Sequence, residues 1–371
     1  MSRSHHLLLA AAGATAVNLA FWLAPTRRLA RALRRPPPRP PARPAPLSVV
    51  AAARNEARRL PAALDGLLAQ EHPRLEVVVC DDDSDDDTPQ LLAARAADPR
   101  LRVVSAGPKR GPGKKHALAT AIAHARHDWL LATDADCRPA SVRWAATLQA
   151  AAGPHAEIVL GYGPYRRLAG GGWLNRWIRY EAFYTAVQYF SAALAGRPYM
   201  GVGRNLLYAR RLYDRLGGFR AHAHLAGGDD DLLVNAGGRA HNVAVCLAPE
   251  AWAVSEPHRT WAAYARQKRR HLSAATAYRL ADRLWLGALA ASHLGHYLGV
   301  AALAARGRGR WAALLYGARL AGTWPRAARL ARGMGVGDLA PLFPLADAGV
   351  AAYYLLGSLA FAPRADRGRA W

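Results

Sequence analysis

Aspartates gather at one point of an otherwise basic chain. Residues 81–87 read DDDSDDD, directly after the apolar run 75–80, whereas the whole chain has 26 acidic residues against 50 Lys and Arg and a net charge of +24. The cluster has three possible interpretations. It is a solvated turn in which Asp87 caps the next helix, a calcium loop, or a site that accepts hydrogen bonds from a nucleobase. The calcium loop fails because the twelfth position from Asp81 is Leu92, where a glutamate is required.

A second acidic pair, Asp134 and Asp136, closes the apolar stretch 128–133. In an extended backbone, positions i and i+2 point the same way, so these carboxylates converge. Carboxylate oxygens are the ligands that Mg²⁺ and Mn²⁺ prefer, and such ions bridge to phosphate oxygens. The pair therefore indicates a divalent metal site for a phosphate-bearing ligand.

Short apolar runs alternate with segments of helical spacing through the first half of the chain. This alternation is typical of an α/β fold with a mainly parallel sheet, whose strands are buried on both faces. Ligands of such sheets bind at the carboxyl ends of the strands, where both acidic clusters fall. The predicted strands are 47–53, 75–80, 101–106, 128–134 and 157–162.

Seven motifs follow one another over about residues 47–275, namely VVAAARNE, DDDSDDDT, RGPGKKHAL, ATDADC, GVGRNLLYARRLYDRLGGF, GGDDDLLVN and QKRRH. In type and order they resemble the motifs of family-2 glycosyltransferases, most closely membrane-anchored bacterial members. The resemblance implies a GT-A nucleotide-diphospho-sugar transferase domain.

The resemblance also implies roles for individual residues in an inverting transfer from a nucleotide sugar, with a UDP-sugar expected. Asp136, with Asp134, corresponds to the ligands of Mg²⁺ or Mn²⁺, and Asp229 or Asp230 to the general base. The remaining roles are binding of the nucleotide sugar by Ala52, Glu56, Asp82, Lys114 and Asp134, and lining of the acceptor or diphosphate side by Gln267 and Arg270.

Three positions depart from the family pattern. Asp83 replaces the usual glycine, which leaves the turn conformation open. Gly228 replaces the acid before the base, so Asp229 aligns as the base only if Leu232 fixes the register, with Asp230 as the alternative. His271 replaces the tryptophan of the QxxRW motif, which weakens the case for a processive polymer synthase.

Uncharged segments at both ends predict membrane attachment. Residues 7–24 are long enough for a membrane anchor, and the arginine- and proline-rich stretch that follows is typical of a cytoplasmic linker. Residues 284–305 and 339–362 are further span candidates. The sequence thus predicts an anchor (1–24), a basic linker (25–46), a GT-A domain (47–280) and a C-terminal membrane region of two or three helices (281–371) in the cytoplasmic, inner membrane, with the catalytic domain on the cytoplasmic side.

Two stretches between and before these spans leave alternatives open. Residues 311–324 contain Arg319 and either span or lie at the interface, and residues 325–338 are typical of a basic, surface-lying helix. The aromatic stretch 171–194 is either a core helix or an interfacial helix beside an acceptor channel. The latter favours a lipid-linked or other membrane-delivered acceptor, with a glycan as the wider class.

Two other functions remain as alternatives. A nucleotidyltransferase shares the sheet and the acidic pair but has no use for the GGDDDL and QxxR elements. A membrane-tethered nucleic-acid binder is supported by charge alone, so no nucleic acid is expected as a partner. The widely spaced Cys80, Cys137 and Cys246 predict neither a disulfide framework nor a zinc site.

Overall fold

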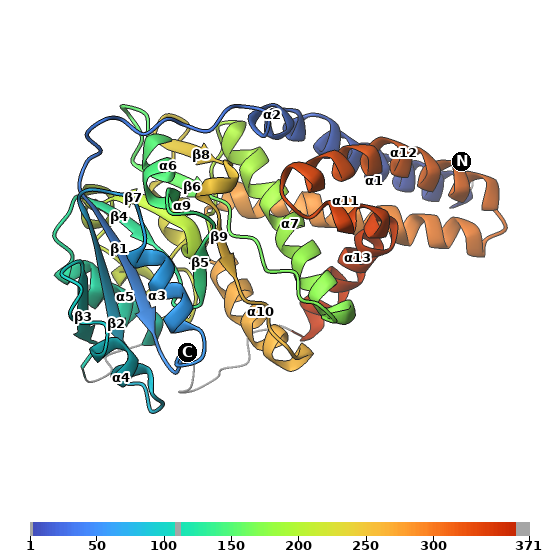
Figure 1. Cartoon of the computed structure of the whole chain (residues 1–371). Helices are drawn as coiled ribbons and strands as arrows, with labels where there is room; N and C mark the ends of the chain where they lie inside the picture. Colours follow the sequence, from blue (N-terminus) through green and yellow to red (C-terminus); the bar gives the residue numbers. More distant parts are fainter. Residues whose placement is uncertain (1–2, 108–112, 361–371) are drawn as a thin grey trace.

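A computed structural model describes residues 3–107 and 113–360 of the chain (Figure 1). Its centre is a seven-stranded sheet in the order β3-β2-β1-β4-β7-β6-β8, in which β7 runs antiparallel to β4 and β6 and the other pairs are parallel. The predicted α/β class and all five predicted strands are confirmed. The strands are β1 Leu47–Ala53, β2 Leu75–Asp81, β3 Leu101–Ser105, β4 Trp129–Ala132, β6 Ile158–Gly161, β7 Leu206–Ala209 and β8 Val243–Cys246.

Helices cover both faces of this sheet. Val50 and Val78 point to one face, against α5 (Gly113–His124) and α7 (Gly172–Leu194). Val49 and Val77 point to the other, against α3 (Leu60–Leu68), α4 (Thr88–Ala93) and α6 (Trp144–Ala150). Because both sets of side chains are buried, the strands read as continuous apolar runs rather than as alternating ones.

Shorter elements complete the globular part. A second sheet pairs β5 (Cys137–Pro139) antiparallel with β9 (Ala253–Ser255). The sequence predicted neither strand, because three residues carry too little periodicity. The other elements are α8 Arg210–Arg215, α9 Asp231–Gly237, α10 Trp261–Ala275 and the 3₁₀ helices η1 Gly203–Asn205, η2 Arg220–His222, η3 Pro249–Ala251 and η4 Gly337–Leu342.

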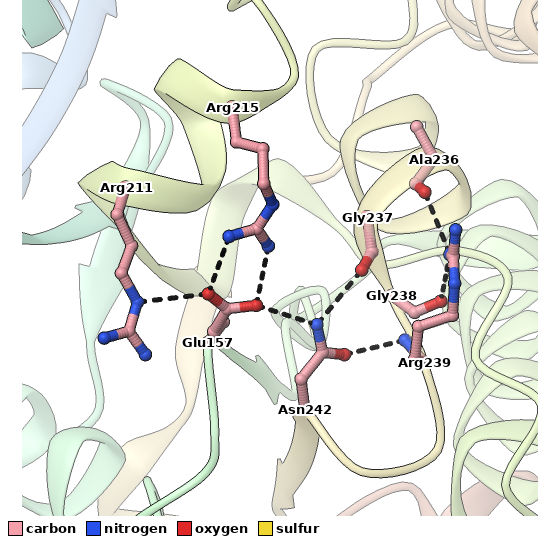
Figure 2. Close-up of polar contacts among 8 residues, drawn as sticks. All are labelled: Glu157, Arg211, Arg215, Ala236, Gly237, Gly238, Arg239 and Asn242. Carbon is pink, nitrogen blue, oxygen red and sulfur yellow. Dashed lines mark hydrogen bonds and ion pairs between the residues drawn. The ribbon is translucent and has the colours of Figure 1, made fainter.

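Glu157, which precedes β6, ties α8 to the start of β8 (Figure 2). Its carboxylate accepts hydrogen bonds from Arg211 (3.0 Å), from Arg215 (2.7 Å) and from the amide of Asn242 (3.0 Å). The Asn242 amide also donates to the carbonyl of Gly237, at the end of α9. The network thus holds α8, α9 and the start of β8 together at the edge of the sheet.

The Glu157 network predicts an acid-sensitive contribution to stability. Hydrogen bonds from Arg215, then from Asn242 and Arg211, lower the pKa of Glu157 from 4.5 to about 2. A lowered pKa means that the ionised carboxylate stabilises the fold above pH 4.5 and that this contribution disappears as the pH falls towards 2. We expect Glu157→Gln to cost about 1–2 kcal/mol at pH 7, since both arginines are largely exposed. Thermal unfolding at pH 7 and at pH 2.5 should show this difference shrinking, and an equal difference at both values would contradict the prediction.

Long helices extend from the globular part, and α1, α11 and α12 lie together on the right of Figure 1. Three segments are long and apolar enough to cross a membrane, namely His5–Ala32, Leu280–Ala305 and Gly337–Leu356. They contain or overlap the three predicted spans, of which residues 361–362 lie outside the described part of the chain. The helices are α1 Arg3–Leu23, α2 Pro25–Ala32, α11 Leu280–Ala305, α12 Gly309–Gly333 and α13 Phe343–Ala360.

Two segments of this region pack against other elements more closely than the local sequence indicates. The predicted linker 25–46 starts with helix α2, whose Thr26 and Leu29 are buried. Residues 325–333 are not a separate surface helix, because α12 continues through Pro325 and buries Ala327 and Leu330. In both cases tertiary contacts offset the low apolar content of the local sequence.

The aromatic stretch 171–194 forms α7, and the core interpretation holds for most of its length. From Trp177 to Ala192 nearly every side chain is buried, between the sheet and the long helices. Only its first turns are open, where Trp173 is 41% exposed. The all-round burial explains why the sequence shows no clear apolar stripe here.

A buried ion pair joins two of the long helices. Arg319 on α12 and Asp347 on α13 are 1% and 0% exposed, with Nη1 and Oδ2 2.6 Å apart. Asn18 on α1 accepts from Arg319 (3.0 Å), and Tyr297 on α11 donates to Asp347 (2.6 Å). One polar network therefore links four helices.

Removing one partner of this ion pair should destabilise the protein strongly. We expect Arg319→Leu to cost about 3–5 kcal/mol, because Asp347 is left buried without its counter-charge. The matched control is the double variant Arg319→Leu with Asp347→Leu, which removes both charges and should recover most of the loss. Thermal unfolding in detergent measures both, and equal losses in the single and double variants would contradict the explanation.

Candidate active site

The loops after β1 and β2 interlock at the carboxyl edge of the sheet. Asn55 and Asp83 both have positive φ, at 55° and 57°. The Asn55 side chain accepts from the backbone N–H of Asp85 (3.0 Å), and Ser84 Oγ accepts from the Asn55 N–H (3.0 Å). Asp83 thus keeps the left-handed conformation that the usual glycine would adopt, and aspartate is among the side chains that tolerate it best.

The aspartate cluster also has a structural role, carried by Asp86. Its carboxylate accepts from the N–H of Ala57 (3.1 Å) and from the N–H of Thr88 (2.9 Å). Asp87 stands at the N-cap of α4 but makes no side-chain capping bond. The prediction that Asp87 caps this helix is therefore wrong, and Asp86 satisfies the first turn in its place.

Three residues proposed for the nucleotide lie together beside these loops. Ala52 is buried near the end of β1, and Asp82 is fully buried with its N–H bonded to the carbonyl of Ala53 (2.9 Å). Glu56 follows β1 and holds Arg59 at 3.4 Å. Burial, and then the charge of Asp136, raise the pKa of Glu56 to about 7. Glu56 therefore lies within electrostatic range of the acidic pair.

The acidic pair forms a group suited to a cation. One ligand atom each from Asp134, Asp136 and Cys137 lie within 4.8 Å of one another. Burial, then the neighbouring carboxylates, raise the pKa of Cys137 well above its ordinary value, so the thiol stays protonated. Two converging carboxylates fit a hard ion such as Mg²⁺ or Mn²⁺, with the remaining positions left for water or phosphate oxygens.

Lys114, on the first turn of α5, connects this pair to the second acidic cluster. Its Nζ lies 2.9 Å from Asp134 and 3.1 Å from Asp229. Burial alone would lower the pKa of Lys114, but the charges of Asp134 and Asp229 raise it well above the ordinary value. The ammonium is therefore charged, and the Asp134 and Asp229 carboxylates both contact it. Residues 110–112 of the same motif lie outside the described part of the chain.

The three consecutive aspartates before α9 have different environments. Asp230 caps the helix, accepting from the N–H groups of Asp231 (2.7 Å) and Gly203 (2.5 Å). Asp231 accepts from the Tyr278 hydroxyl (2.7 Å). Asp229 instead faces Lys114, whose charge outweighs burial and lowers the pKa of Asp229. Of the three, Asp229 is the carboxylate directed at the acidic pair.

Gly228 has a conformational reason to differ from the family pattern. Its φ is +97°, and a Cβ there would lie 2.5 Å from Leu232 Cδ1. A glutamate would be strained there, and its Cβ would clash with the Leu232 side chain. The local backbone therefore requires glycine at this position.

The QxxR residues lie on α10, at a different wall. Gln267 contacts the Tyr165 hydroxyl (3.2 Å), and the Arg204 guanidinium stacks 4.4 Å from the centre of the Tyr165 ring. Within the described residues, Arg270 has no carboxylate within 4 Å. Neither Gln267 nor Arg270 contacts the carboxylates of the proposed metal site.

Sequence reasoning missed two cations near the acidic pair. The charges of Arg59 and Arg204 both act to lower the pKa of Asp136, although burial and Asp134 together raise it. Both arginines therefore add positive charge near the acidic pair. Among many arginines in the chain no local signal singles them out, since their position depends on the folding of α3 and η1.

The mainly parallel sheet with its reversed strand β7, and the pair Asp134 and Asp136 linked through Lys114 to Asp229, are features of the GT-A class of nucleotide-sugar transferases. The family described as "Glycosyltransferase like family 2" matches residues 44–274, more than half of the chain. The chain therefore belongs to this family and is a glycosyltransferase. The match includes the GGDDDL and QxxR elements, so the nucleotidyltransferase and nucleic-acid-binding alternatives are not supported.

Two relatives illustrate the similarity. The mannosyltransferase PcManGT from Pyrobaculum calidifontis, in complex with GDP-Man and Mn²⁺, is 25% identical with a TM-score of 0.59, over 94% of this chain and 99% of that one. The succinoglycan biosynthesis protein ExoO of Rhizobium meliloti (strain 1021) is 42% identical over 90 residues. That match spans 24% of this chain and 25% of ExoO.

Proposed function

We propose that this glycosyltransferase moves a sugar, with inversion, from a nucleotide-diphospho-sugar to a lipid-linked or polysaccharide acceptor at the cytoplasmic face of the membrane. The observation that carries the proposal is the contact of one ammonium, Lys114, with both Asp134 and Asp229. This contact supports a site in which Asp229 acts as the base close to the carboxylates that would hold the metal. Inversion requires that the general base and the metal-bound leaving group lie on opposite sides of the anomeric carbon.

One set of residues in the proposed site stabilises the leaving group. Breaking the bond to the anomeric carbon places negative charge on a nucleoside diphosphate. Asp134 and Asp136 would hold the divalent ion, which supplies Lewis-acid stabilisation of that charge when bound. Arg59 and Arg204 add fixed positive charge, while Ala52, Glu56 and Asp82 would contact the nucleoside. Lys114 would exchange its contact with Asp134 for the diphosphate.

A second set of residues binds and activates the acceptor. Its hydroxyl must lose a proton as it attacks, and Asp229 is the carboxylate placed to take it. The hydrogen bonds that Asp230 accepts from Gly203 and Asp231 leave it less suited to this role. Gln267 and Arg270, on α10, would line the acceptor or diphosphate side.

A UDP-sugar remains the expected donor, with Mn²⁺ or Mg²⁺ as cofactor. A GDP-sugar is the second candidate, because PcManGT was solved with GDP-Man and Mn²⁺. A surface-polysaccharide or glycolipid acceptor is supported by the partial match to a succinoglycan biosynthesis protein and by the three candidate spans. The arginine-rich segment after the first span favours a cytoplasmic catalytic domain.

The test is release of UDP or GDP from a panel of sugar donors by the detergent-purified chain. We expect release with one donor, with Mn²⁺ or Mg²⁺ present, and loss of release with EDTA. Restoration by added metal controls for unfolding. Metal-independent release, or no release from any donor with membrane lipid supplied, would overturn the proposal.

A further inference from the structure

A groove rich in arginine lies beside the proposed active site and is used by none of the steps above. Two adjoining cavities, of about 660 and 340 Å³, share the β6–α7 loop as a common wall. We call them together the arginine groove. Its charged lining consists of Arg166, Arg167, Arg176, Arg179, Arg259 and Asp338.

The positive charge of this groove exceeds what its own ion pairs balance. Arg179 is buried, donates to both oxygens of Asp338 at 2.7 Å, and keeps a buried Nε without a hydrogen-bond partner in the described structure. Arg166 pairs with Glu256 at 2.8 Å. Arg176 and Arg259 have no carboxylate within 4 Å among the described residues. Such a surplus in a concave site attracts an anion.

The backbone adds to this preference. The 23-residue helix α7 begins at Gly172, in the wall of the groove, and no side chain caps its N-terminus. The free N–H groups and the helix dipole favour a negative group there. Arginine beside a helix N-terminus is well suited to phosphate, because the guanidinium can donate two parallel hydrogen bonds.

Strand pairing places the groove close to the acidic pair. Cys137, next to Asp136, pairs with Ser255 across β5 and β9, and Ser255 in turn bridges to Tyr165. The next residue, Arg166, donates its N–H to the Ser255 carbonyl (2.9 Å) and lines the groove. Two strand spacings amount to roughly 10 Å. The wall of the groove at Arg166 therefore lies roughly two strand spacings from the strand that follows the acidic pair.

A candidate membrane span contributes to the lining of the smaller of the two cavities. Asp338 and Leu342, both in the segment Gly337–Leu356, line it. Trp173 and Trp261, at the starts of α7 and α10, are 41% and 51% exposed. Exposed tryptophan is typical of the level of lipid headgroups. The groove thus opens where a membrane-borne molecule would present its polar end.

We propose that the arginine groove binds the phosphate of a lipid phosphate, and that this lipid carries the sugar whose hydroxyl accepts the transfer. The assignment of the lipid as carrier of the acceptor rests on the proposed function, whereas phosphate binding by the groove does not. Arg176 and Arg259 are the principal binding residues, with Arg179 held in place by Asp338. The lipid chain extends along α13 and the tryptophans.

Binding of farnesyl phosphate to the full chain in detergent tests the proposal, with farnesol and inorganic phosphate as the comparison ligands. We expect farnesyl phosphate to bind at least tenfold more tightly than either. The double variant Arg176→Gln/Arg259→Gln should weaken it at least tenfold, while Arg176→Lys/Arg259→Lys should lose less. The matched control, Arg95→Gln/Arg143→Gln, removes two partly exposed arginines elsewhere and should bind as the wild type does.

Each other outcome overturns a definite part of the proposal. Equal binding of farnesol would exclude a phosphate site, and equal binding of inorganic phosphate would assign the groove to a soluble phosphate compound. Unchanged binding of farnesyl phosphate by the Arg176→Gln/Arg259→Gln variant would show that the arginine groove is not the binding site. Donor turnover by the wild type is measured separately, so its absence beside intact farnesyl phosphate binding would overturn the proposed function and not the site.

Discussion

Replacing Asp229 by Asn should lower the rate of sugar transfer by about 10²–10⁴-fold, the range that a positioned general base contributes. The asparagine oxygen can still accept the hydrogen bond from Lys114, which now lies 3.1 Å from Asp229. The shape of the site is therefore kept while the basic group is lost. Transfer rates measured at saturating donor and acceptor give the effect directly.

The matched control is Asp230→Asn, one residue away. Asp230 accepts two backbone hydrogen bonds, from Gly203 and Asp231, and asparagine can accept these only through its one carbonyl oxygen. We expect a lower unfolding temperature with most of the activity retained. If the Asp230 variant is inactive and the Asp229 variant active, Asp230 is the base and the register set by Leu232 is wrong.

Replacing Asp136 by Asn should lower metal-dependent turnover by about a thousandfold, because Lewis-acid stabilisation of the leaving diphosphate is worth several kcal/mol. Asp136 is one of two carboxylates in the group that could hold the ion. Titration of Mn²⁺ followed by electron paramagnetic resonance should show weaker binding, independently of activity. Turnover against metal concentration gives the second readout.

The control for Asp136 comes from the acidic cluster itself. Asp87 is exposed and makes no capping bond. Asp87→Asn removes the same charge from the same edge of the sheet, so Mn²⁺ binding and turnover should stay at the wild-type level. Comparable losses in both variants would show that general negative charge, rather than coordination by Asp136, attracts the metal.

The local sequence was enough to predict the features that depend only on residues close together in the chain. The apolar runs 47–53, 75–80 and 128–134 predicted strands of the parallel sheet, because a strand that is buried on both faces needs apolar side chains at nearly every position. The spacing of Asp134 and Asp136 predicted that they converge, since side chains two apart in extended backbone share a direction. The order of motifs along the chain predicted the family.

Tertiary structure decided which of several similar residues lie near one another. The motif left Asp229 and Asp230 as alternatives for the base, and the packing of α9 against η1 is what directs Asp229 towards Lys114 and Asp230 towards the backbone. Arg319 is a lone charge in an apolar stretch until α13 brings Asp347 to it. Asp83 keeps the left-handed turn that its sequence position left in doubt, because the interlocked loops hold it there. These outcomes depend on contacts between residues far apart in the chain, which local spacing does not encode.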